Sequence, residues 1–322
     1  MRKGKGIVLV TLAVVAVLAV AALLGACGKS KSKSTSTSTA TASTAWSLPN
    51  PMNGQLTGTA TANFTQVLGH APTGLAAKIA QRGTIIIAND PNYAPQSYVD
   101  PKTKQLVGFD VDSAKAAAQT LGLKIKWVHP NWEDIPANLQ TGAFDVSVGS
   151  MTDTKAREGT VSFTQPYYYT PAQVFVKKGG PQITGPQDLN GKTVGVGAAT
   201  TYWTYLKKFT KADVKTYNTD LEAIPPLLNG QIEFFMTAAP TGLGAINNGK
   251  PIEFSGKPLY YEALCFATKL NEPDLIAVLN YAIGKMHEVP SGATDSLLTT
   301  MSKHWYNGVD LTVTQGIKPL VF

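Results

Sequence analysis

Two neighbouring stretches of the chain read Gly149-Ser-Met-Thr-Asp-Thr-Lys-Ala-Arg157 and Val161-Ser-Phe-Thr-Gln-Pro-Tyr-Tyr168. Residues 144–148, in which apolar and polar residues alternate, come directly before them, and a segment with an apolar centre, residues 173–177, follows. Short apolar runs bounded by polar and turn-forming residues are typical of buried strands. The two stretches therefore lie between two predicted strands, and the same pattern extends outward from them in both directions.

Strand-like and helix-like segments alternate through the rest of the chain. The predicted strands are residues 84–88, 123–128, 144–148, 173–177, 192–196, 214–217, 233–236 and 264–268. The predicted helices are residues 75–81, 108–121, 136–139, 201–209, 221–228, 273–289 and 293–304. This rhythm indicates an α/β architecture with largely parallel sheets.

Charge is concentrated at one end of the sequence. The chain has 322 residues and a formal charge of +7, with 28 basic and 21 acidic residues. Six of the basic residues lie within the first 33 positions, where there is no acid: Arg2, Lys3, Lys5, Lys29, Lys31 and Lys33. Without these six, 22 basic residues stand against 21 acids, a net charge of +1. A nearly neutral body argues against nucleic acid as a partner.

The N-terminus is typical of an export signal. Basic residues in Met1–Gly6 precede an apolar run, Ile7–Leu24, which ends in Leu24-Gly-Ala-Cys27. This order predicts a signal peptide over residues 1–26. The small-small-Cys ending resembles the bacterial lipobox, which implies that Cys27 is acylated and anchors the protein to the membrane. The alternative is an uncleaved transmembrane anchor, since the run approaches the roughly 18–20 residues that span a bilayer.

The composition changes sharply after Cys27. Residues 28–45 are almost entirely Ser, Thr, Ala and Lys, and residues 46–73 are rich in Gly, Pro, Asn and Thr. Such segments bury too little apolar surface to offset the entropy of ordering them. We therefore predict a flexible tether over residues 27–77, with no firm structure in residues 46–73.

Several segments resemble one protein family. They are Gly108-Phe-Asp-Val-Asp112, Trp132-Glu-Asp-Ile-Pro-Ala-Asn-Leu-Gln-Thr-Gly142, Asp145, the two stretches quoted first, and Asp188-Leu-Asn-Gly-Lys-Thr-Val-Gly195. Together they are similar to the bacterial extracellular solute-binding proteins of polar amino-acid ABC importers, family 3, which have the type II periplasmic-binding fold. The Thr-x-x-Arg segment and the Ser-Phe-x-x-Pro-Tyr-Tyr segment are its most specific parts. The resemblance covers residues 75–307.

The resemblance implies a two-lobed α/β fold with two crossover hinge strands. The crossovers are expected near residues 173–176 and 262–267. Lobe 1 then comprises residues 78–173 plus 262–322, and lobe 2 comprises residues 174–261. Receptors of this family are monomers that close on a small ligand and deliver it to ABC permease subunits.

The resemblance also implies where a ligand would bind. Arg157 corresponds to the arginine that holds the ligand carboxylate in a bidentate pair, for which a planar guanidinium is suited. Ser150 and Thr152 would add hydroxyl and backbone contacts. The alternative to this ligand-binding role is that Arg157 is an ordinary exposed surface residue.

Aromatic, acidic and hydroxyl residues complete the predicted site. Tyr93 and Trp132 correspond to the aromatic walls around the ligand, although aromatics are more often core residues. Asp90 would meet a polar or cationic ligand group, unless it merely caps a turn. Thr200 and Thr201 match a loop at a helix N-terminus, where backbone N–H groups favour an anion.

One departure from the family pattern concerns the ligand's α-ammonium. The family usually carries an aspartate before x-Pro-Thr, and here Ala238 takes that place. An ammonium without an anionic partner is costly in a closed cleft. Either another acid such as Asp90 substitutes, or the ligand lacks an α-ammonium. The carboxylate-binding expectation is unaffected.

Two other functions, an enzyme and a sensor module, are alternatives to a non-enzymatic receptor. Some exported dehydratases acting on cyclic carboxylates share this fold, but no catalytic spacing is legible here. A sensor module would need a membrane segment after the binding domain, and none is seen before Phe322. Cys265 is expected to be a small buried hydrophobe rather than a disulfide partner of Cys27. The four histidines have no ligand-like spacing, so we expect no metal or cofactor.

Overall fold

The structure, a computed structural model, describes residues 46–313 and 319–320. The predicted signal peptide, Cys27 and the first part of the predicted tether lie outside these residues. Residues from Ser47 onward belong to one packed unit. Within the described ranges, none of the helices is long and apolar enough to cross a membrane.

An eight-stranded mixed sheet runs through this unit, in the order β5-β1-β6-β11-β7-β10-β8-β9. Its strands are β1 (Thr84–Ala88), β5 (Lys124–Val128), β6 (Val146–Thr152), β7 (Val161–Lys177), β8 (Thr193–Gly197), β9 (Asp213–Tyr217), β10 (Phe234–Ala238) and β11 (Ile252–Lys269). A small antiparallel sheet, which the sequence pattern did not predict, comprises β2 (Asn92–Tyr93), β3 (Ser97–Val99) and β4 (Leu106–Val107).

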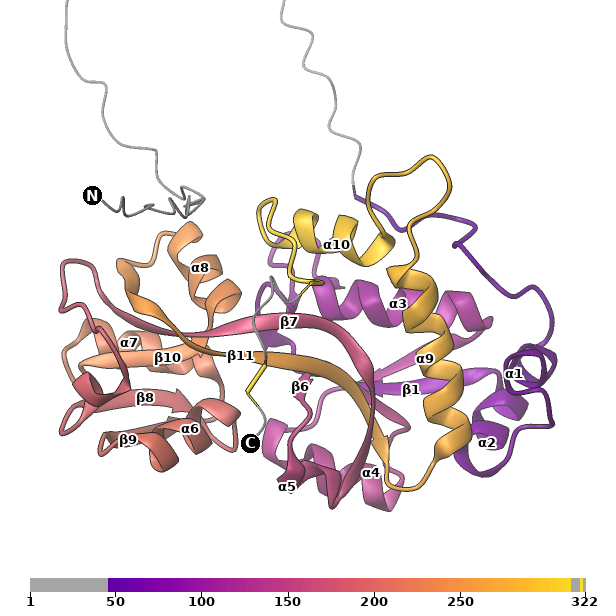
Figure 1. The fold of residues 1–322 in the computed structure, drawn as a ribbon, viewed down its shortest axis with the longest axis horizontal. Helices are drawn as coiled ribbons and strands as arrows, with labels where there is room; N and C mark the ends of the chain where they lie inside the picture. The colour runs from indigo at the N-terminus through magenta and orange to yellow at the C-terminus, as the bar shows by residue number, and fades with distance from the viewer. Residues whose placement is uncertain (1–45, 314–318, 321–322) are drawn as a thin grey trace, which may run out of the picture. The chain divides into compact units, whose positions relative to one another are not determined.

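Two strands, β7 and β11, pair with each other through most of their length (Figure 1). On one side, β11 also pairs with β6 through Leu264–Thr268; on the other, β7 pairs with β10 through Ala172–Phe175. Between these outer pairings the β7–β11 ladder connects the two halves, for example at Glu262 opposite Thr170. The C-terminal part of the chain bonds the same region: the Tyr169 N–H donates to the Leu311 carbonyl at 2.7 Å, and the Leu320 N–H donates to the Tyr261 carbonyl at 2.8 Å. This arrangement confirms the two-lobed fold with two crossover strands.

The flanking strands are parallel, as predicted: β1 with β5 and β6, and β8 with β9 and β10. The central strands are antiparallel, because the chain crosses between lobes in opposite directions along β7 and β11. Both crossovers are much longer than the predicted runs 173–177 and 264–268. Polar residues and prolines interrupt the apolar pattern earlier in β7 and hide its length.

Helices cover both lobes. They are α1 (Ala60–Leu68), α2 (Gly74–Arg82), α3 (Phe109–Leu121), α4 (Ile135–Thr141), α5 (Lys155–Glu158), α6 (Thr201–Phe209), α7 (Ile224–Leu228), α8 (Ala239–Asn247), α9 (Pro273–His287) and α10 (Leu297–Trp305). Short 3-10 turns lie at η1 (Trp132–Asp134), η2 (Pro186–Leu189) and η3 (Asp220–Ala223). The last helix starts four residues later than predicted because Ser296 caps it, accepting from the Thr299 N–H at 3.1 Å.

The structure corrects the expectation that residues 46–73 have no firm structure. Helix α1 lies there, capped by Thr59 at its start and by Gly69, with φ 75°, at its end. The α1 helix contacts α3 and α9, and Phe64 is fully buried. Asn63 joins α1 to α3 by donating from Nδ2 to the Leu121 carbonyl at 3.0 Å. The capped apolar turn is too short to stand out against a Gly- and Thr-rich background.

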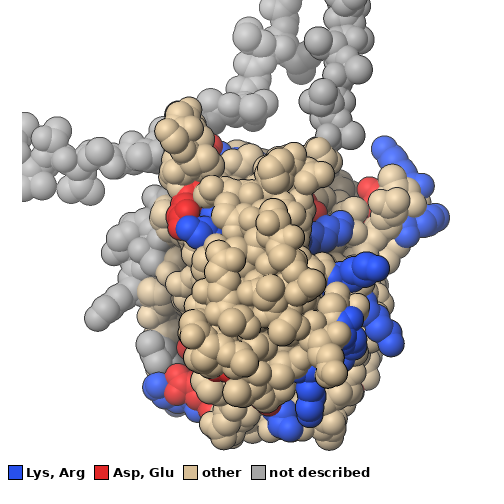
Figure 2. Space-filling model, turned by 90° about the vertical axis from the view of Figure 1, so that its right-hand side faces the viewer, with Lys and Arg blue, Asp and Glu red and all other residues tan. Residues whose placement is uncertain are grey.

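Surface charge is unevenly spread on the face shown in Figure 2. Lysines and arginines gather along one edge, and the middle of the face is neither acidic nor basic. On this face, positive charge that could meet a polyanion is concentrated along that edge.

Replacing Phe64 by alanine tests whether α1 is part of the fold. Because Phe64 is fully buried, Phe64→Ala should lower the free energy of unfolding by about 3–5 kcal/mol in urea titrations. The exposed Val289→Ala should change it by less than about 0.5 kcal/mol. An unchanged unfolding midpoint for Phe64→Ala would mean that α1 is not docked in solution.

Candidate functional site

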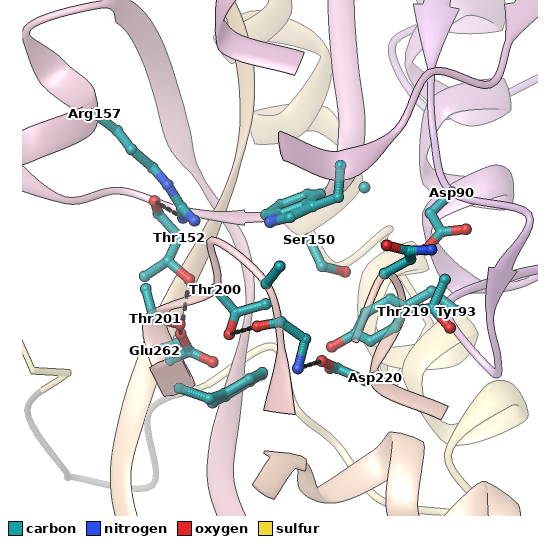
Figure 3. Close-up of a pocket in the computed structure, with 16 residues that line it drawn as sticks. Asp90, Tyr93, Ser150, Thr152, Arg157, Thr200, Thr201, Thr219, Asp220 and Glu262 are labelled. Atoms are coloured by element: carbon teal, nitrogen blue, oxygen red, sulfur yellow. Dashed lines mark hydrogen bonds between the residues drawn. The ribbon is translucent and has the colours of Figure 1, made fainter. Parts of the chain in front are cut away.

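One pocket lies between the lobes and is lined from both of them (Figure 3). It brings together all eight predicted ligand-binding residues: Asp90, Tyr93, Trp132, Ser150, Thr152, Arg157, Thr200 and Thr201. They come from loops, β2, η1, β6, α5 and the start of α6, so residues more than a hundred positions apart share one space. Their roles toward a ligand stay predictions; their convergence is a structural fact.

Arg157 reaches the pocket from the short helix α5, whose start is capped by the Thr154 hydroxyl. Its Nη1 donates to the Thr152 carbonyl at 3.0 Å and its Nη2 to the Ala199 carbonyl at 3.1 Å. The guanidinium also lies 5.4 Å from the centre of the Trp132 ring. Burial lowers the pKa of Arg157, but a guanidinium stays protonated in proteins. These two bonds use two of five N–H donors and fix the direction of the rest.

Ser150 has a left-handed backbone, with φ 58°, and its hydroxyl is held from behind the pocket. The Ser150 Oγ donates to Asp110 Oδ2 at 2.7 Å and bonds the Tyr168 hydroxyl at 2.5 Å. The Tyr167 hydroxyl donates to Asp110 Oδ1 at 2.6 Å. Burial raises the pKa of Asp110 to about 6. Asp110 of the Gly-Phe-Asp motif therefore positions the end of β6, which carries Ser150.

Glu262 is a pocket residue that the sequence analysis did not single out as a site residue. It is 1% exposed and lies in the two-stranded connection. Its Oε1 accepts from the hydroxyls of Thr152, at 2.8 Å, and Thr201. Burial raises the pKa of Glu262, while the Thr201 hydroxyl and the Arg157 charge lower it. A lone acid inside an apolar crossover strand was the available signal.

Asp220, at the start of η3, is the second pocket acid that was missed. It is 6% exposed, and its Oδ1 accepts from the Gly197 N–H at 3.0 Å while its Oδ2 accepts from the Thr237 hydroxyl at 2.6 Å. Burial, together with the charges of Glu262 and Asp90, raises the pKa of Asp220 to about 7, although the Thr237 hydroxyl and the Gly197 N–H lower it. The sequence offered no signal, because an aspartate before a helical turn is a common cap.

Asp90 caps a turn, which was the alternative to a ligand-binding role, and it also lines the pocket. Its Oδ1 accepts from the Asn92 N–H at 2.8 Å, as a turn-capping aspartate does. Trp132 lies on the pocket wall of lobe 1, and its indole N–H donates across to the Ala199 carbonyl at 3.4 Å. Ala199 therefore receives hydrogen bonds from both Trp132 and Arg157 of the other lobe.

The start of α6 has its hydroxyls already engaged. The Thr200 Oγ1 accepts from the Trp203 N–H at 3.2 Å and donates to the Gly197 carbonyl at 2.8 Å, as a helix cap does. The Thr201 hydroxyl donates to Glu262. A ligand at this helix end would meet backbone N–H groups rather than the Thr200 side chain.

The comparisons with known proteins agree with one another. The sequence pattern of the bacterial extracellular solute-binding proteins, family 3, matches residues 85–306. The chain belongs to this family. The L-cystine-binding protein TcyJ of Escherichia coli (strain K12) is 28% identical over 249 residues, 76% of this chain and 91% of TcyJ. The L-arginine-binding protein of Pseudomonas aeruginosa is 32% identical over 203 residues, 59% of this chain and 78% of that protein.

A solved structure supports the same fold. The ancestral amino acid-binding protein AncCDT-1, described as a precursor of cyclohexadienyl dehydratase, has a TM-score of 0.64 and is 30% identical. The match covers 71% of this chain and 98% of AncCDT-1.

Ala238 of this family 3 protein stands at the end of β10, directly before α8, and is 1% exposed. It is not among the residues that line the pocket, but its neighbour Thr237 donates to Asp220. Cys265 is buried, as predicted, and burial raises its pKa far above the ordinary value. In the described part of the chain, no group of His, Cys, Asp and Glu could hold a metal ion.

The raised pKa of Asp220 predicts a pH dependence for the ligand-free protein. Between pH 4 and 7 the folded state holds a proton that the unfolded state has lost, so the stability should fall as the pH rises through this window. Asp220→Asn should flatten that slope in urea unfolding measured at several pH values.

Asp188→Asn is the matched control in the same lobe. Hydrogen bonds from Thr184 lower the pKa of Asp188, so its contribution is lost only as the pH falls below about 4. This variant should leave the slope between pH 4.5 and 7.5 unchanged. An equal slope for the wild type and Asp220→Asn would contradict the burial of an ionisable Asp220.

Proposed function

We propose that this protein is the extracytoplasmic substrate-binding component of an ABC importer, and that it captures a small carboxylate-bearing solute, an amino acid or a related compound. One observation carries the proposal: the Arg157 guanidinium is desolvated in the pocket and oriented by carbonyls of both lobes. A planar guanidinium in such a place matches a carboxylate, which it binds through paired charge-assisted hydrogen bonds.

Capture by hinge closure is supported by the contacts across the pocket. Trp132 and Arg157 both donate to Ala199, and the two long strands that pass between the lobes are β7 and β11. We assign lobe 1 to residues 78–173 plus 262–322, with α1 docked onto it, and lobe 2 to residues 174–261. A two-stranded connection can bend while the lobes remain rigid. The ligand would stabilise the closed state that the permease subunits recognise.

The relatives support an amino acid as the solute. TcyJ is named for L-cystine and the Pseudomonas aeruginosa protein for L-arginine, and both ligands carry α-carboxylates. We infer that this protein acts as a monomer, delivers an amino acid or a close relative, and needs no cofactor.

Anchoring through Cys27 is part of the same proposal. The small-small-Cys ending of the apolar run and the Ser/Thr-rich segment at residues 28–45 suit a lipid-anchored receptor on a tether. A lipid anchor would keep the receptor close to its permease.

An exported dehydratase on the same fold is the second candidate. Asp220, with a pKa of about 7, would be able to donate a proton near neutral pH, as a general acid does. AncCDT-1 is described as a precursor of a dehydratase. Incubation with prephenate or arogenate tests this alternative, and measurable turnover would establish it. Because three acids line the pocket against one arginine, an anionic cyclic substrate would be repelled, so we expect none.

Arg157→Ala should weaken binding of the cognate ligand at least about 100-fold in calorimetry, because it removes two charge-assisted hydrogen bonds worth about 1.5–3 kcal/mol each. Arg157→Lys should recover only part of the loss, since an ammonium cannot make the planar pair. Lys155→Ala, an exposed position on the same helix, is the control and should bind normally. Normal binding by a folded Arg157→Ala protein would rule out this site.

Cys27→Ser should release the protein from the membrane. In a bacterial host we expect the wild type in the membrane fraction, with the mass of an attached lipid on Cys27. The mature variant should be found in the soluble exported fraction, and any variant left in the membrane fraction should be uncleaved precursor. A wild-type protein without lipid would refute anchoring and leave the ligand-binding proposal untouched.

A further inference from the structure

The pocket carries more negative than positive charge. Three carboxylates line it, Asp90, Asp220 and Glu262, and Arg157 is the one cationic side chain among the lining residues. A ligand carboxylate would occupy Arg157 and leave these acids without a cation. Carboxylates that are buried on closure need cationic partners or protons, because solvent no longer screens them. The charge inventory therefore points to cationic groups on the ligand.

Glu262 is linked through one residue to Arg157, the proposed partner of the ligand carboxylate. Thr152 joins the two, since its carbonyl accepts from Arg157 and its hydroxyl donates to Glu262 Oε1. The other oxygen, Oε2, is buried and has no hydrogen-bond partner among the described residues. In an α-amino acid one carbon separates the carboxylate from the ammonium. An ammonium beside a carboxylate on Arg157 would supply donors to Oε2.

Glu262 is also held from both lobes. Thr152 belongs to β6 of lobe 1 and Thr201 to α6 of lobe 2, and both hydroxyls donate to the same oxygen. The two hydroxyls orient the carboxylate without carrying a charge, and the Arg157 charge, which lowers the pKa of Glu262, would be taken up by a ligand carboxylate. An acid that is oriented but not neutralised is suited to receive a cation.

Asp220 is a second acid without a charged partner. Its hydrogen-bond donors, the Gly197 N–H and the Thr237 hydroxyl, are both neutral. In Figure 3, Asp220 and Asp90 lie on the side of the pocket away from Arg157. The ligand's far end would therefore meet Asp220, with Asp90 adding negative charge nearby.

We propose that the ligand is an α-amino acid with a second cationic group on its side chain, and that Glu262 binds the α-ammonium while Asp220 binds the side-chain cation. This rests on the proposed function, because Arg157 must hold the α-carboxylate. It also accounts for Ala238: the acid usual at that position is replaced by acids on β11 and η3. Organic acids and dicarboxylates are poor ligands in this assignment.

Calorimetry at pH 8 with paired ligands tests the proposal. L-Arginine and L-lysine should bind at least 100-fold more tightly than L-citrulline and L-norleucine, which match them in length and lack the side-chain charge. Agmatine, which lacks the carboxylate, and glutarate, which lacks both cations, should bind weakly or not at all.

Variants of Asp220 and Glu262 should have different effects on the affinities for cationic and neutral amino acids. Asp220→Asn should weaken binding of whichever cationic amino acid binds better by at least 10-fold and change the citrulline affinity less than 3-fold. Glu262→Gln should weaken arginine and citrulline by similar factors, because both carry an α-ammonium. Asp213→Asn, an exposed acid of the same lobe, is the control and should bind like the wild type.

A measurement on the wild type covers the case in which a variant fails to fold. The groups that face Asp220 are Glu262, Asp90, Tyr93 and Tyr202. Protonation of Asp220 as the pH falls from 8 to 6 should weaken arginine binding several-fold more than citrulline binding. Equal pH profiles would overturn the assignment of Asp220 to the side-chain cation.

The outcomes distinguish the two proposals. If neutral amino acids bind as tightly as cationic ones and Arg157→Ala abolishes both, the proposed function stands and the cationic ligand is wrong. If no amino acid binds, or if Arg157→Ala binds normally, the proposed function itself fails.

Discussion

The ladder between β7 and β11 is the constraint on which the pocket depends. It passes through both lobes, while the other strands pair with it on one side or the other and leave a two-stranded segment between them. Backbone pairing continues across this segment, so in the proposed closure the connection would bend while keeping its ladder. Glu262 lies in that segment and contacts both lobes, which couples the hinge to the site.

Buried polarity sets this site apart from the rest of the core. The backs of both lobes are packed with apolar side chains, whereas the pocket holds acids with raised pKa values, Asp220 and Glu262 among them. Neutral hydroxyls and N–H groups orient these acids, and Arg157, whose charge lowers the pKa of Glu262, is one cationic side chain against three acids in the pocket lining. Such an arrangement costs folding stability and becomes favourable when a ligand supplies the missing charge.

Local patterns carried much of the prediction. Helix 201–209 was placed correctly because Thr200 gives it a cap and its apolar face repeats at helical spacing. The eight predicted site residues line one pocket, at the positions that the family resemblance indicated. The prediction failed at α1, where the apolar residues around Phe64 are too few to show a helical pattern. It also failed in β7, where Pro166 and the polar residues near it break the strand pattern.

By itself the sequence determined the alternation of strands and helices and the place of Arg157 in the family motif, because each depends on neighbouring residues; the export signal and the carboxylate-binding role of Arg157 stay predictions from the same local patterns. The acidic character of the pocket was decided by tertiary structure. Asp220 and Glu262 look like a helix cap and a strand residue when read along the chain. They become a pair of buried acids only when β11, η3 and α6 meet, since burial and mutual charge depend on distance in space.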